Sequence, residues 1–258
     1  KPDLAVFFIG GGGYTFPRYL EATLPESTLV VAEIDPGVTE VAHALLGLAP
    51  DTRIRTFNMD ARNVLAWETL PNSYDVIFGD AFNDYAVPFH LTTREFDLLV
   101  ERALRDDGLY LVNIIDGGPH GHFFRAYVRT LRAVFDHVVV IPSRENWRDA
   151  VRTTFVLAAS QAPIDLSGLP PEYRPMPQGA LDEYLALEKP IILTDQYVPV
   201  DNLMAPVVED SFFSFELSPE MVSRIVPRVL VVAIGGIALA LSGIAWLVYR
   251  RLRLGNHR

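Results

Sequence analysis

The sequence predicts an α/β fold, in which a seven-stranded, mostly parallel sheet is covered by helices on both faces, followed by a C-terminal transmembrane helix. Two observations predict the sheet. Short apolar runs alternate with amphipathic stretches along residues 4–159, and the first of these runs ends in four consecutive glycines. A third observation predicts the membrane helix, because residues 229–249 contain no charged side chain.

The first apolar run, residues 4–9, indicates a buried parallel strand. The turn that follows it consists of Gly10, Gly11, Gly12 and Gly13. Glycine permits positive φ and lets a ligand approach the backbone closely. A helix over residues 15–23 would direct free N–H groups at whatever lies over the turn. The turn therefore predicts a site for a nucleotide-type ligand.

The second strand, residues 28–35, ends in two acids about 20 residues after the glycines. In dinucleotide-binding folds an acid at this place accepts hydrogen bonds from ribose hydroxyls. We expect Glu33 to take this role because it lies at the tip of the strand. Asp35 precedes Pro36, and this pair is also a common start of a helix, here expected over residues 36–46.

The remaining elements are expected, in chain order, as strand 53–58, helix 62–67, strand 74–80, loop 81–91, helix 93–105, strand 109–115, helix 123–135 and strands 137–141 and 152–159. Asp60 follows the third strand and Asp80 ends the fourth. The carboxyl ends of parallel strands meet at one edge, so Glu33, Asp60 and Asp80 are expected to converge beside the glycine turn. A helix before two final strands, with the last strand at the edge, favours a Rossmann-like, methyltransferase-type sheet.

Composition limits the partners of the chain. A net charge of -10 argues against nucleic acid, which requires a basic face. The absence of cysteine excludes disulfides, thiolate metal sites and a cysteine nucleophile. His90, His120 and His122 have no further ligand at a useful spacing, so no metal is expected.

Residues 229–249 are long enough to span the hydrocarbon core of a bilayer, with Trp246 and Tyr249 at one end as interfacial aromatics. A buried core helix is the alternative. Small residues four apart along the span allow a helix partner. The arginines that flank the span are Arg224 and Arg228 before it, and Arg250, Arg251, Arg253 and Arg258 after it. The positive-inside rule therefore places the C-terminus in the cytoplasm and the domain on the outer side.

Four regions are expected. Residues 1–160 are expected to form the Rossmann-type domain, which begins almost at its first strand without a signal peptide, so that either further residues precede Lys1 or the fold opens at its central strand. Residues 161–227 hold ten of the 19 prolines and form an arm that packs on the domain, or else a surface for another subunit. Residues 228–250 form the transmembrane helix, and residues 251–258 form a basic tail. In the first region, Arg125, Arg129 and Arg132 have helical spacing and are expected to form a solvated face.

These motifs resemble the polyamine aminopropyltransferase (spermidine synthase) family, and more closely its bacterial membrane-fused branch. The family's loop Gly-Gly-Gly-Asp-Gly-Gly is similar to residues 10–15, its Glu-Ile-Asp to residues 33–35, its Asp-Ala to residues 60–61 and its Asp-Ser-Ser-Asp-Pro to residues 80–84. Residues 90–96 and 193–200 are similar to its later segments Leu-Phe-Thr-x-Glu-Phe and Thr-Asp-Asp-Tyr-Ala-Pro. The resemblance covers about residues 4–205.

The resemblance implies decarboxylated S-adenosylmethionine as aminopropyl donor, bound at the glycine turn. Glu33 would bind its ribose, and Asp60 with Ala61 its adenine. Asp80 would be the base, because an ammonium cannot attack the carbon beside the sulfonium until it loses a proton. The residues expected nearer the amine substrate are Tyr14, Asn83, Asp84 and Tyr85. The two tyrosines could instead pack into the core.

The chain departs from the family at three places. Gly13 replaces the loop aspartate, which would favour intact S-adenosylmethionine because its carboxylate is no longer repelled. Asn83, or Asp84 shifted by one residue, replaces the second acid of the fourth-strand motif. The family's N-terminal β-hairpin domain is not found in this sequence.

Three functions follow from the sequence. The resemblance implies a transferase, expected in the bacterial inner membrane, that moves an aminopropyl or related alkyl group from an S-adenosyl donor to a polyamine or other small amine. Alternatively, the chain is a catalytically degenerate homologue that serves a membrane complex as a structural or assembly subunit, or a nucleoside sensor. Membrane lipid, and other subunits bound through the transmembrane helix, are the expected partners.

Overall fold

A computed structural model describes residues 2–81, 87–170 and 173–213 of the chain. Contacts divide the chain into two compact units, Lys1–Ser211 and Phe212–Arg258. Of the second unit, only Phe212 and Phe213 are among the described residues. The fold and the site described below belong to the first unit.

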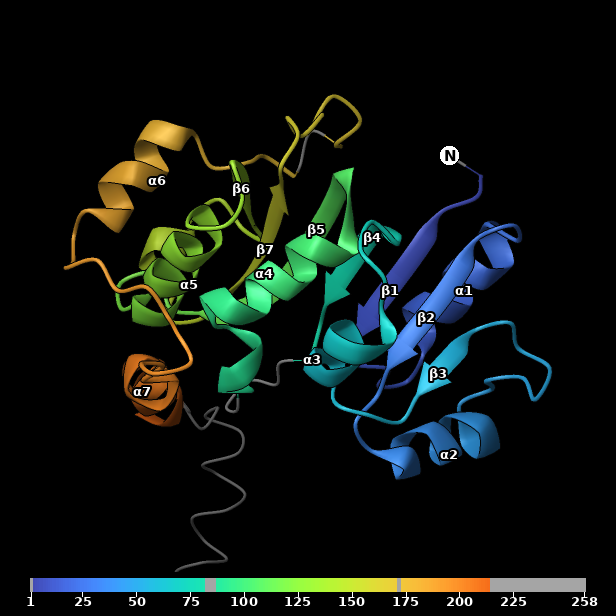
Figure 1. Ribbon diagram of the computed structural model, residues 1–258. Helices are drawn as coiled ribbons and strands as arrows, with labels where there is room; N and C mark the ends of the chain where they lie inside the picture. Colours follow the sequence, from blue (N-terminus) through green and yellow to red (C-terminus); the bar gives the residue numbers. More distant parts are fainter. Residues whose placement is uncertain (1, 82–86, 171–172, 214–258) are drawn as a thin grey trace, which may run out of the picture. The chain divides into compact units, whose positions relative to one another are not determined.

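Strands and helices alternate along this unit (Figure 1). In chain order the elements are β1 (Ala5–Ile9), α1 (Thr15–Thr23), β2 (Thr28–Ala32), α2 (Pro36–Leu45), β3 (Arg55–Phe57), α3 (Ala61–Asn63), the π-helical turn η1 (Val64–Glu68), β4 (Tyr74–Gly79), the 3-10 turn η2 (Phe89–Leu91), α4 (Arg94–Ala103), β5 (Leu104–Asp116), α5 (His122–Arg132), β6 (His137–Pro142), the 3-10 turn η3 (Trp147–Asp149), β7 (Thr153–Ser160), α6 (Gln178–Leu185) and α7 (Val200–Phe213).

The seven strands form one sheet in the order β3-β2-β1-β4-β5-β7-β6. Strands β1 to β5 pair in parallel, and β7 runs antiparallel to both of its neighbours. The predicted class, a mostly parallel seven-stranded α/β sheet, is confirmed. The order reverses beside β1, so the carboxyl ends of β1 and β4 flank the point where ligands bind in open α/β sheets.

The prediction that the last strand lies at the edge is wrong, because β7 lies between β5 and β6. Strand β7 is the longer of the final pair, and most of its side chains are buried, including Ala158 and Ala159. Such a strand is satisfied best with a hydrogen-bonded partner on each side. Strand β6 ends in Pro142, which has no N–H to donate and is tolerated on an edge strand.

The alternation of side chains along β1 divides the core between the two faces of the sheet. Val6 and Phe8 pack in a cluster with residues of α1 and α2. Phe7 and Ile9 pack in a larger cluster with residues of α3, α4 and α5. Helices α4 and α5 lie in front of the sheet in Figure 1. The glycine turn follows Ile9 directly. The two core clusters therefore fix, from both faces of the sheet, the strand from which the turn starts.

The part of the arm that is described within the first unit, residues 161–170 and 173–211, contributes to the larger core. Leu181 of α6 and Leu193 after it are fully buried in that cluster. The arm also covers the basic side of α5, so the prediction that these arginines form a solvated face is wrong. Arg125 is 2% exposed and donates to Glu188, 2.7 Å away. The other two arginines also hold the arm, Arg129 through backbone carbonyls and Arg132 through Asp182.

No helix within residues 2–81, 87–170 and 173–213 has both the length and the apolar character needed to cross a membrane. Residues 229–249, where the transmembrane helix is predicted, lie outside the described residues.

A buried acid in α4 makes the stability of the fold sensitive to pH. Asp97 is fully buried, and a weak contact with the hydroxyl of Tyr127 only partly offsets the burial of its carboxylate. Burial, and secondarily the charge of Glu95, raise the pKa of Asp97 well above its usual range. The native state therefore keeps a proton that the unfolded chain has released. The free energy of unfolding falls as pH rises between the unfolded and the native pKa.

We expect Asp97→Asn to stabilise the protein near neutral pH by on the order of 1 kcal/mol, because the amide, unlike the carboxylate, needs no proton to be neutral there. The gain should shrink as the pH falls toward about 4, the pKa of an unfolded aspartate. Urea unfolding at a series of pH values measures it. Asp116, whose pKa burial raises to about 7, is present in both proteins and cancels in the difference. The exposed substitution Asp106→Asn is the control, and a gain that does not vary with pH would contradict the explanation.

Candidate functional site

The glycine turn connects β1 to α1 in a backbone conformation that residues with a side chain rarely adopt. Gly10 has φ of 94° and Gly12 has φ of 48°. A Cβ on Gly10 would lie 3.1 Å from the carbonyl oxygen of Asp80. The end of β1 can therefore approach the end of β4 only because residue 10 is glycine.

Glu33 follows β2 and turns toward this glycine turn. One carboxylate oxygen, Oε2, accepts hydrogen bonds from the N–H groups of Gly11 and Gly12 at 2.9 and 3.1 Å. The other oxygen, Oε1, accepts from the N–H of Asp35 at 3.0 Å. Because a carboxylate oxygen has two lone pairs, Oε1 keeps one acceptor position for a ribose hydroxyl. The turn's N–H groups already face an anion, which disfavours a phosphate there.

The other acid after β2 has a structural role. Asp35 is the N-cap of α2, and its side chain accepts a hydrogen bond from the N–H of Gly37 at 2.8 Å. Pro36 occupies the first helical position. The helix-cap alternative for Asp35 is therefore confirmed.

Asp60 lies between β3 and α3 and uses both of its oxygens. Oδ1 caps α3 by accepting from the N–H groups of Arg62 and Asn63 at 2.9 and 3.4 Å. Oδ2 lies 2.7 Å from Nε2 of His90. Ala61 follows and is buried, with 5% of its surface exposed. Asp60 and His90 thus form one wall of the site.

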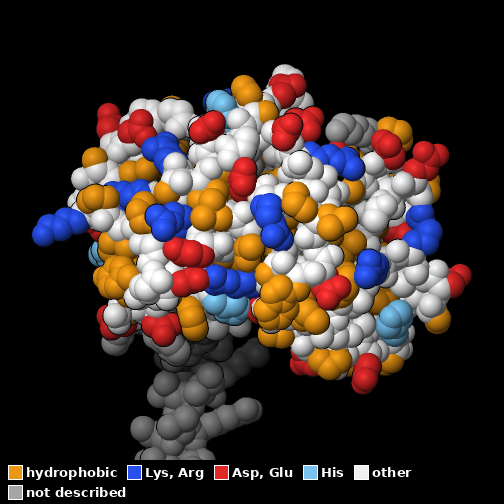
Figure 2. Space-filling model, viewed as in Figure 1, with side chains coloured by type: hydrophobic (Ala, Val, Ile, Leu, Met, Phe, Trp, Pro, Cys, Tyr) orange, Lys and Arg blue, Asp and Glu red, His pale blue; other side chains and the backbone are white. Residues whose placement is uncertain are grey.

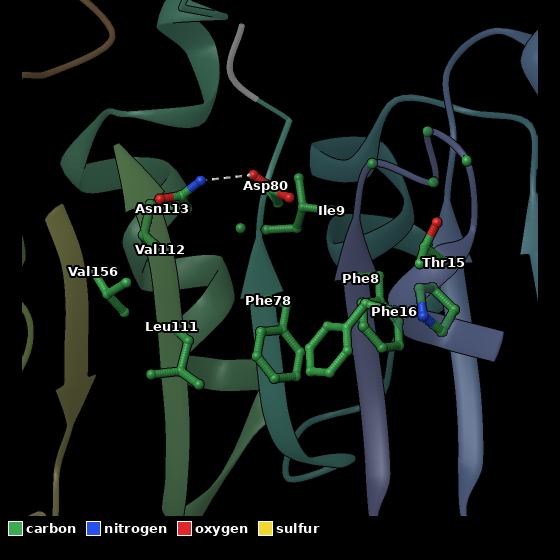
Figure 3. Close-up of a pocket in the computed structure, with 16 residues that line it drawn as sticks. Phe8, Ile9, Thr15, Phe16, Phe78, Asp80, Leu111, Val112, Asn113 and Val156 are labelled. Atoms are coloured by element: carbon green, nitrogen blue, oxygen red, sulfur yellow. Dashed lines mark hydrogen bonds between the residues drawn. The ribbon is translucent and has the colours of Figure 1, made fainter. Parts of the chain in front are cut away.

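Asp80 lies at the carboxyl end of β4, and its Oδ1 accepts a hydrogen bond of 3.2 Å from Nδ2 of Asn113 on β5. Figure 3 shows the two side chains pointing toward each other from neighbouring strands. The amide restricts the rotation of the carboxylate. One exposed acid at a strand end is the arrangement expected of a base that meets a substrate from solvent.

A cavity of about 500 Å³ brings these residues together. Its acidic lining comes from Glu33, Asp60 and Asp80, and its apolar lining includes Ile9, Ile34, Val38 and Leu91. The volume is in the range usual for small-molecule sites. We refer to this cavity as the nucleoside pocket, after the ligand that the sequence predicts for the glycine turn and its neighbouring acids.

A second cavity of about 480 Å³ also reaches Asp80. Its floor contains Phe8, Phe16 and Phe78, which stack or meet edge to face with ring centroids 4.9–5.9 Å apart (Figure 3). Gly13 borders this cavity and not the nucleoside pocket.

Tyr14 lies in the core and not on the pocket wall, so its pocket-lining expectation is corrected. The side chain is fully buried. Its hydroxyl lies 3.0 Å from Oγ1 of Thr39 and donates to Oγ1 of Thr56 at 3.4 Å. The ring packs beneath the turn against Gly11, where an added Cβ would lie 2.7 Å from Cε2 of Tyr14. The other residues expected near the substrate, Asn83, Asp84 and Tyr85, lie outside the described residues.

Sequence reasoning missed three residues around the site. Asn113 lies in the middle of a predicted strand, and only the pairing of β4 with β5 brings it to Asp80. The sequence indicates His90 only as a metal-ligand candidate or a loop histidine, and not as a partner of Asp60. Arg62, which donates to the carbonyl of His90 at 3.0 Å, has no sequence signal at all.

The described surface carries charges of both signs. Figure 2 shows acidic and basic side chains interspersed over one face, without a continuous patch of either sign. Within the described parts of the chain, no group of three or more His, Asp or Glu side chains is arranged to hold a metal ion.

The sheet order and the acids at the strand ends define an α/β fold of the S-adenosylmethionine-dependent methyltransferase type. Human methyltransferase-like protein 13, solved in complex with SAH, has this fold, with a TM-score of 0.51 and 24% identity over 78% of this chain and 89% of its own. No family model matches the chain.

One sequence relative and one solved structure relate the chain to a particular family with this fold. The polyamine aminopropyltransferase of Vibrio vulnificus is 35% identical over 114 residues, which are 44% of this chain and 38% of the relative. A probable spermidine synthase from Corynebacterium glutamicum superposes with a TM-score of 0.57 and 26% identity over 71% of this chain and 63% of its own. The chain is thus a distant homologue of the polyamine aminopropyltransferase (spermidine synthase) family, although it spans less than half the length of the Vibrio enzyme.

Proposed function

We propose that the chain transfers an aminopropyl or related alkyl group from an S-adenosyl donor to a small amine. One observation carries this proposal. The nucleoside pocket brings Glu33, Asp60 and Asp80 together beside the glycine turn, and the three acids fall at the places where the family resemblance assigns ribose, adenine and amine contacts.

In this proposal the nucleoside part of the donor binds to Glu33, Ala61 and Asp60 in the nucleoside pocket. Ribose hydroxyls donate to Oε1 of Glu33, and the adenine ring packs against Ala61 and the apolar walls, with its amino group toward Asp60. The positive sulfonium then lies near the acids at the strand ends. A cationic donor suits this pocket, since the carboxylate of Glu33 already occupies the turn's N–H groups.

Asp80 supplies the chemistry in this proposal. Its carboxylate accepts a proton from the ammonium of the acceptor, which frees the nitrogen lone pair. The nitrogen attacks the carbon bonded to sulfur, a C–N bond forms, and the C–S bond breaks. The electron pair of that bond returns to sulfur, so a neutral thioether nucleoside leaves. Asn113 holds the base in place through the hydrogen bond to Oδ1.

The second candidate is a catalytically degenerate homologue that serves as a structural or assembly subunit of a membrane complex. Gly13 in place of the family's acid favours it, as does the predicted topology. Residues 229–249 would anchor the chain in the bacterial inner membrane, and the arginines after the span would keep the C-terminus in the cytoplasm. The domain would then lie on the outer side, where S-adenosyl donors are not available.

Isothermal titration of the detergent-solubilised protein separates the candidates. The ligands are S-adenosylmethionine, its decarboxylated form and methylthioadenosine. Binding with micromolar affinity supports a working nucleoside pocket. No binding by a demonstrably folded protein would overturn the transferase proposal and favour the structural subunit.

Gly13→Asp tests the donor choice in the same titration. A Cβ at residue 13 meets nothing nearer than Oγ1 of Thr15 at 3.5 Å, so the side chain fits. The new carboxylate should repel the carboxylate of intact S-adenosylmethionine and shift the ratio of the two affinities toward the decarboxylated donor by roughly tenfold, or about 1.4 kcal/mol. Wild-type preference for the decarboxylated donor would disprove the idea that Gly13 selects the intact one.

A further inference from the structure

A tight turn of the arm is built against the wall of the nucleoside pocket. Thr194 and Tyr197 pair through backbone hydrogen bonds of 3.0 and 2.9 Å, with Asp195 between them. Leu193, just before this turn, is fully buried, and its N–H donates to Oγ1 of Thr130 at 2.9 Å. The turn is therefore fixed to the domain on its buried side, and Asp195 has a defined position.

Asp195 is held by three groups of the domain. Arg62 donates to its two carboxylate oxygens at 2.9 and 2.5 Å. Oγ1 of Thr93 donates to Oδ1 at 2.8 Å, and the N–H of Asp195 donates to Glu95 at 2.9 Å. The hydrogen bond to Arg62 is the main cause that lowers the pKa of Asp195, so the pair is ionised at neutral pH. Two parallel hydrogen bonds fix the plane of the guanidinium as well as its distance.

Arg62 carries this constraint to the pocket wall. The nitrogen Nη1 that binds Asp195 also donates to the carbonyl of His90 at 3.0 Å. The ring of His90 contacts Oδ2 of Asp60 at 2.7 Å, and Oδ1 of Asp60 accepts from the N–H of Arg62 at 2.9 Å. The contacts form a closed ring of Arg62, His90 and Asp60, with Asp195 clamping it from outside. His90 and Asp60 both line the nucleoside pocket.

We propose that Asp195 is a positioning residue for the nucleoside pocket, acting through Arg62 on His90 and Asp60. The arm is then part of the binding machinery, although its described residues are not among those that line the pocket. This role rests on the proposed function, because it assumes that Asp60 meets the nucleoside. Without Asp195, the guanidinium of Arg62 is no longer fixed, and His90 and Asp60 become less ordered. Ligand binding must then order these two side chains, which lowers the affinity.

Two matched substitutions test the role. Asp195→Asn removes the ionic clamp while keeping the size of the side chain. Asp182→Asn removes another ion pair between the arm and the domain, Asp182 with Arg132 at 2.7 Å, which lies outside the ring. We expect Asp195→Asn to weaken binding of methylthioadenosine at least about tenfold and Asp182→Asn to leave it unchanged. Equal losses in both variants would mean that the arm acts only through general stability, and would overturn the proposal.

A double-mutant cycle tests the route. If Asp195 acts through His90, then Asp195→Asn should weaken binding by much less when His90→Ala is already present. Losses that add independently would show that the two residues act separately and would also overturn the proposal.

Hydrogen exchange gives a readout that needs no ligand. The amides of Arg62 and Asn63 are capped by Asp60, so they report whether that side chain stays in place. In the ligand-free protein, Asp195→Asn should accelerate their exchange and Asp182→Asn should not. Unchanged exchange overturns the positioning role whatever the affinity. A wild-type protein that does not bind methylthioadenosine overturns the proposed function instead, and the exchange rates still decide the role of Asp195.

Discussion

Asp80→Asn is expected to lower the turnover of any aminopropyl or alkyl transfer by about 10²–10⁴-fold, the usual contribution of a positioned general base. The amide cannot accept the proton of the acceptor ammonium, yet it has the shape of the carboxylate. Formation of the thioether nucleoside under single-turnover conditions measures the rate. Affinity for methylthioadenosine should change little, because in the proposed function Glu33 and Asp60, not Asp80, contact that ligand. Thermal unfolding should also change little, since Asp80 is exposed.

Asp35→Asn is the matched control for this experiment. Asp35 is an acid at the same edge of the sheet, but its side chain caps α2, a role that asparagine fills equally well. Its turnover should equal that of the wild type. Turnover by Asp80→Asn that also matches the wild type would remove Asp80 from the mechanism.

Glu33→Gln is expected to weaken binding of methylthioadenosine by about 10–100-fold, because hydrogen bonds to a charged group contribute roughly 1.5–3 kcal/mol. The carboxylate accepts from three backbone N–H groups, those of Gly11, Gly12 and Asp35, and the glutamine amide can accept through only one oxygen. Its NH₂ group would face at least one of these donors. The variant should therefore also lose about 1–3 kcal/mol of stability.

The control is Glu40→Gln on the exposed side of α2, which should change neither quantity. Titration and urea unfolding of both variants measure the two effects. If Glu33→Gln loses stability but binds methylthioadenosine as tightly as the wild type, Glu33 only braces the glycine turn, and the ribose contact is wrong.

Much of the fold follows from local patterns in the sequence. The predicted helix 15–23 matches α1, because a glycine turn precedes it and its apolar side is clear. Strands β1, β2 and β4 lie where apolar runs end in glycine or an acid, whereas β3 lies in a stretch of alternating side chains. The position of β7 could not be predicted in this way. Both final strands are apolar, and only pairing with β5 decides which of them lies inside the sheet.

The same distinction between local pattern and long-range packing applies to the residues of the site. Acids at the carboxyl ends of β2 and β4 are visible in the sequence, because parallel strands bring their ends to one edge. The contact of Asp195 with Arg62 joins residues 133 positions apart, and no local pattern indicates it. The prediction that Arg125 is exposed was wrong for the same reason, because helical spacing does not show which segment covers a helix.

The sequence by itself determined the class of the fold, the glycine turn and the acids that follow it, because each depends on neighbours along the chain. The tertiary structure alone decided that Glu33 faces the turn's N–H groups, that Asn113 orients Asp80, and that the arm clamps Arg62. Those contacts depend on the order in which the strands pair and on the path of the arm over the domain. Packing between distant segments determines the strand order and the path of the arm. The periodicity of a single segment cannot predict such packing.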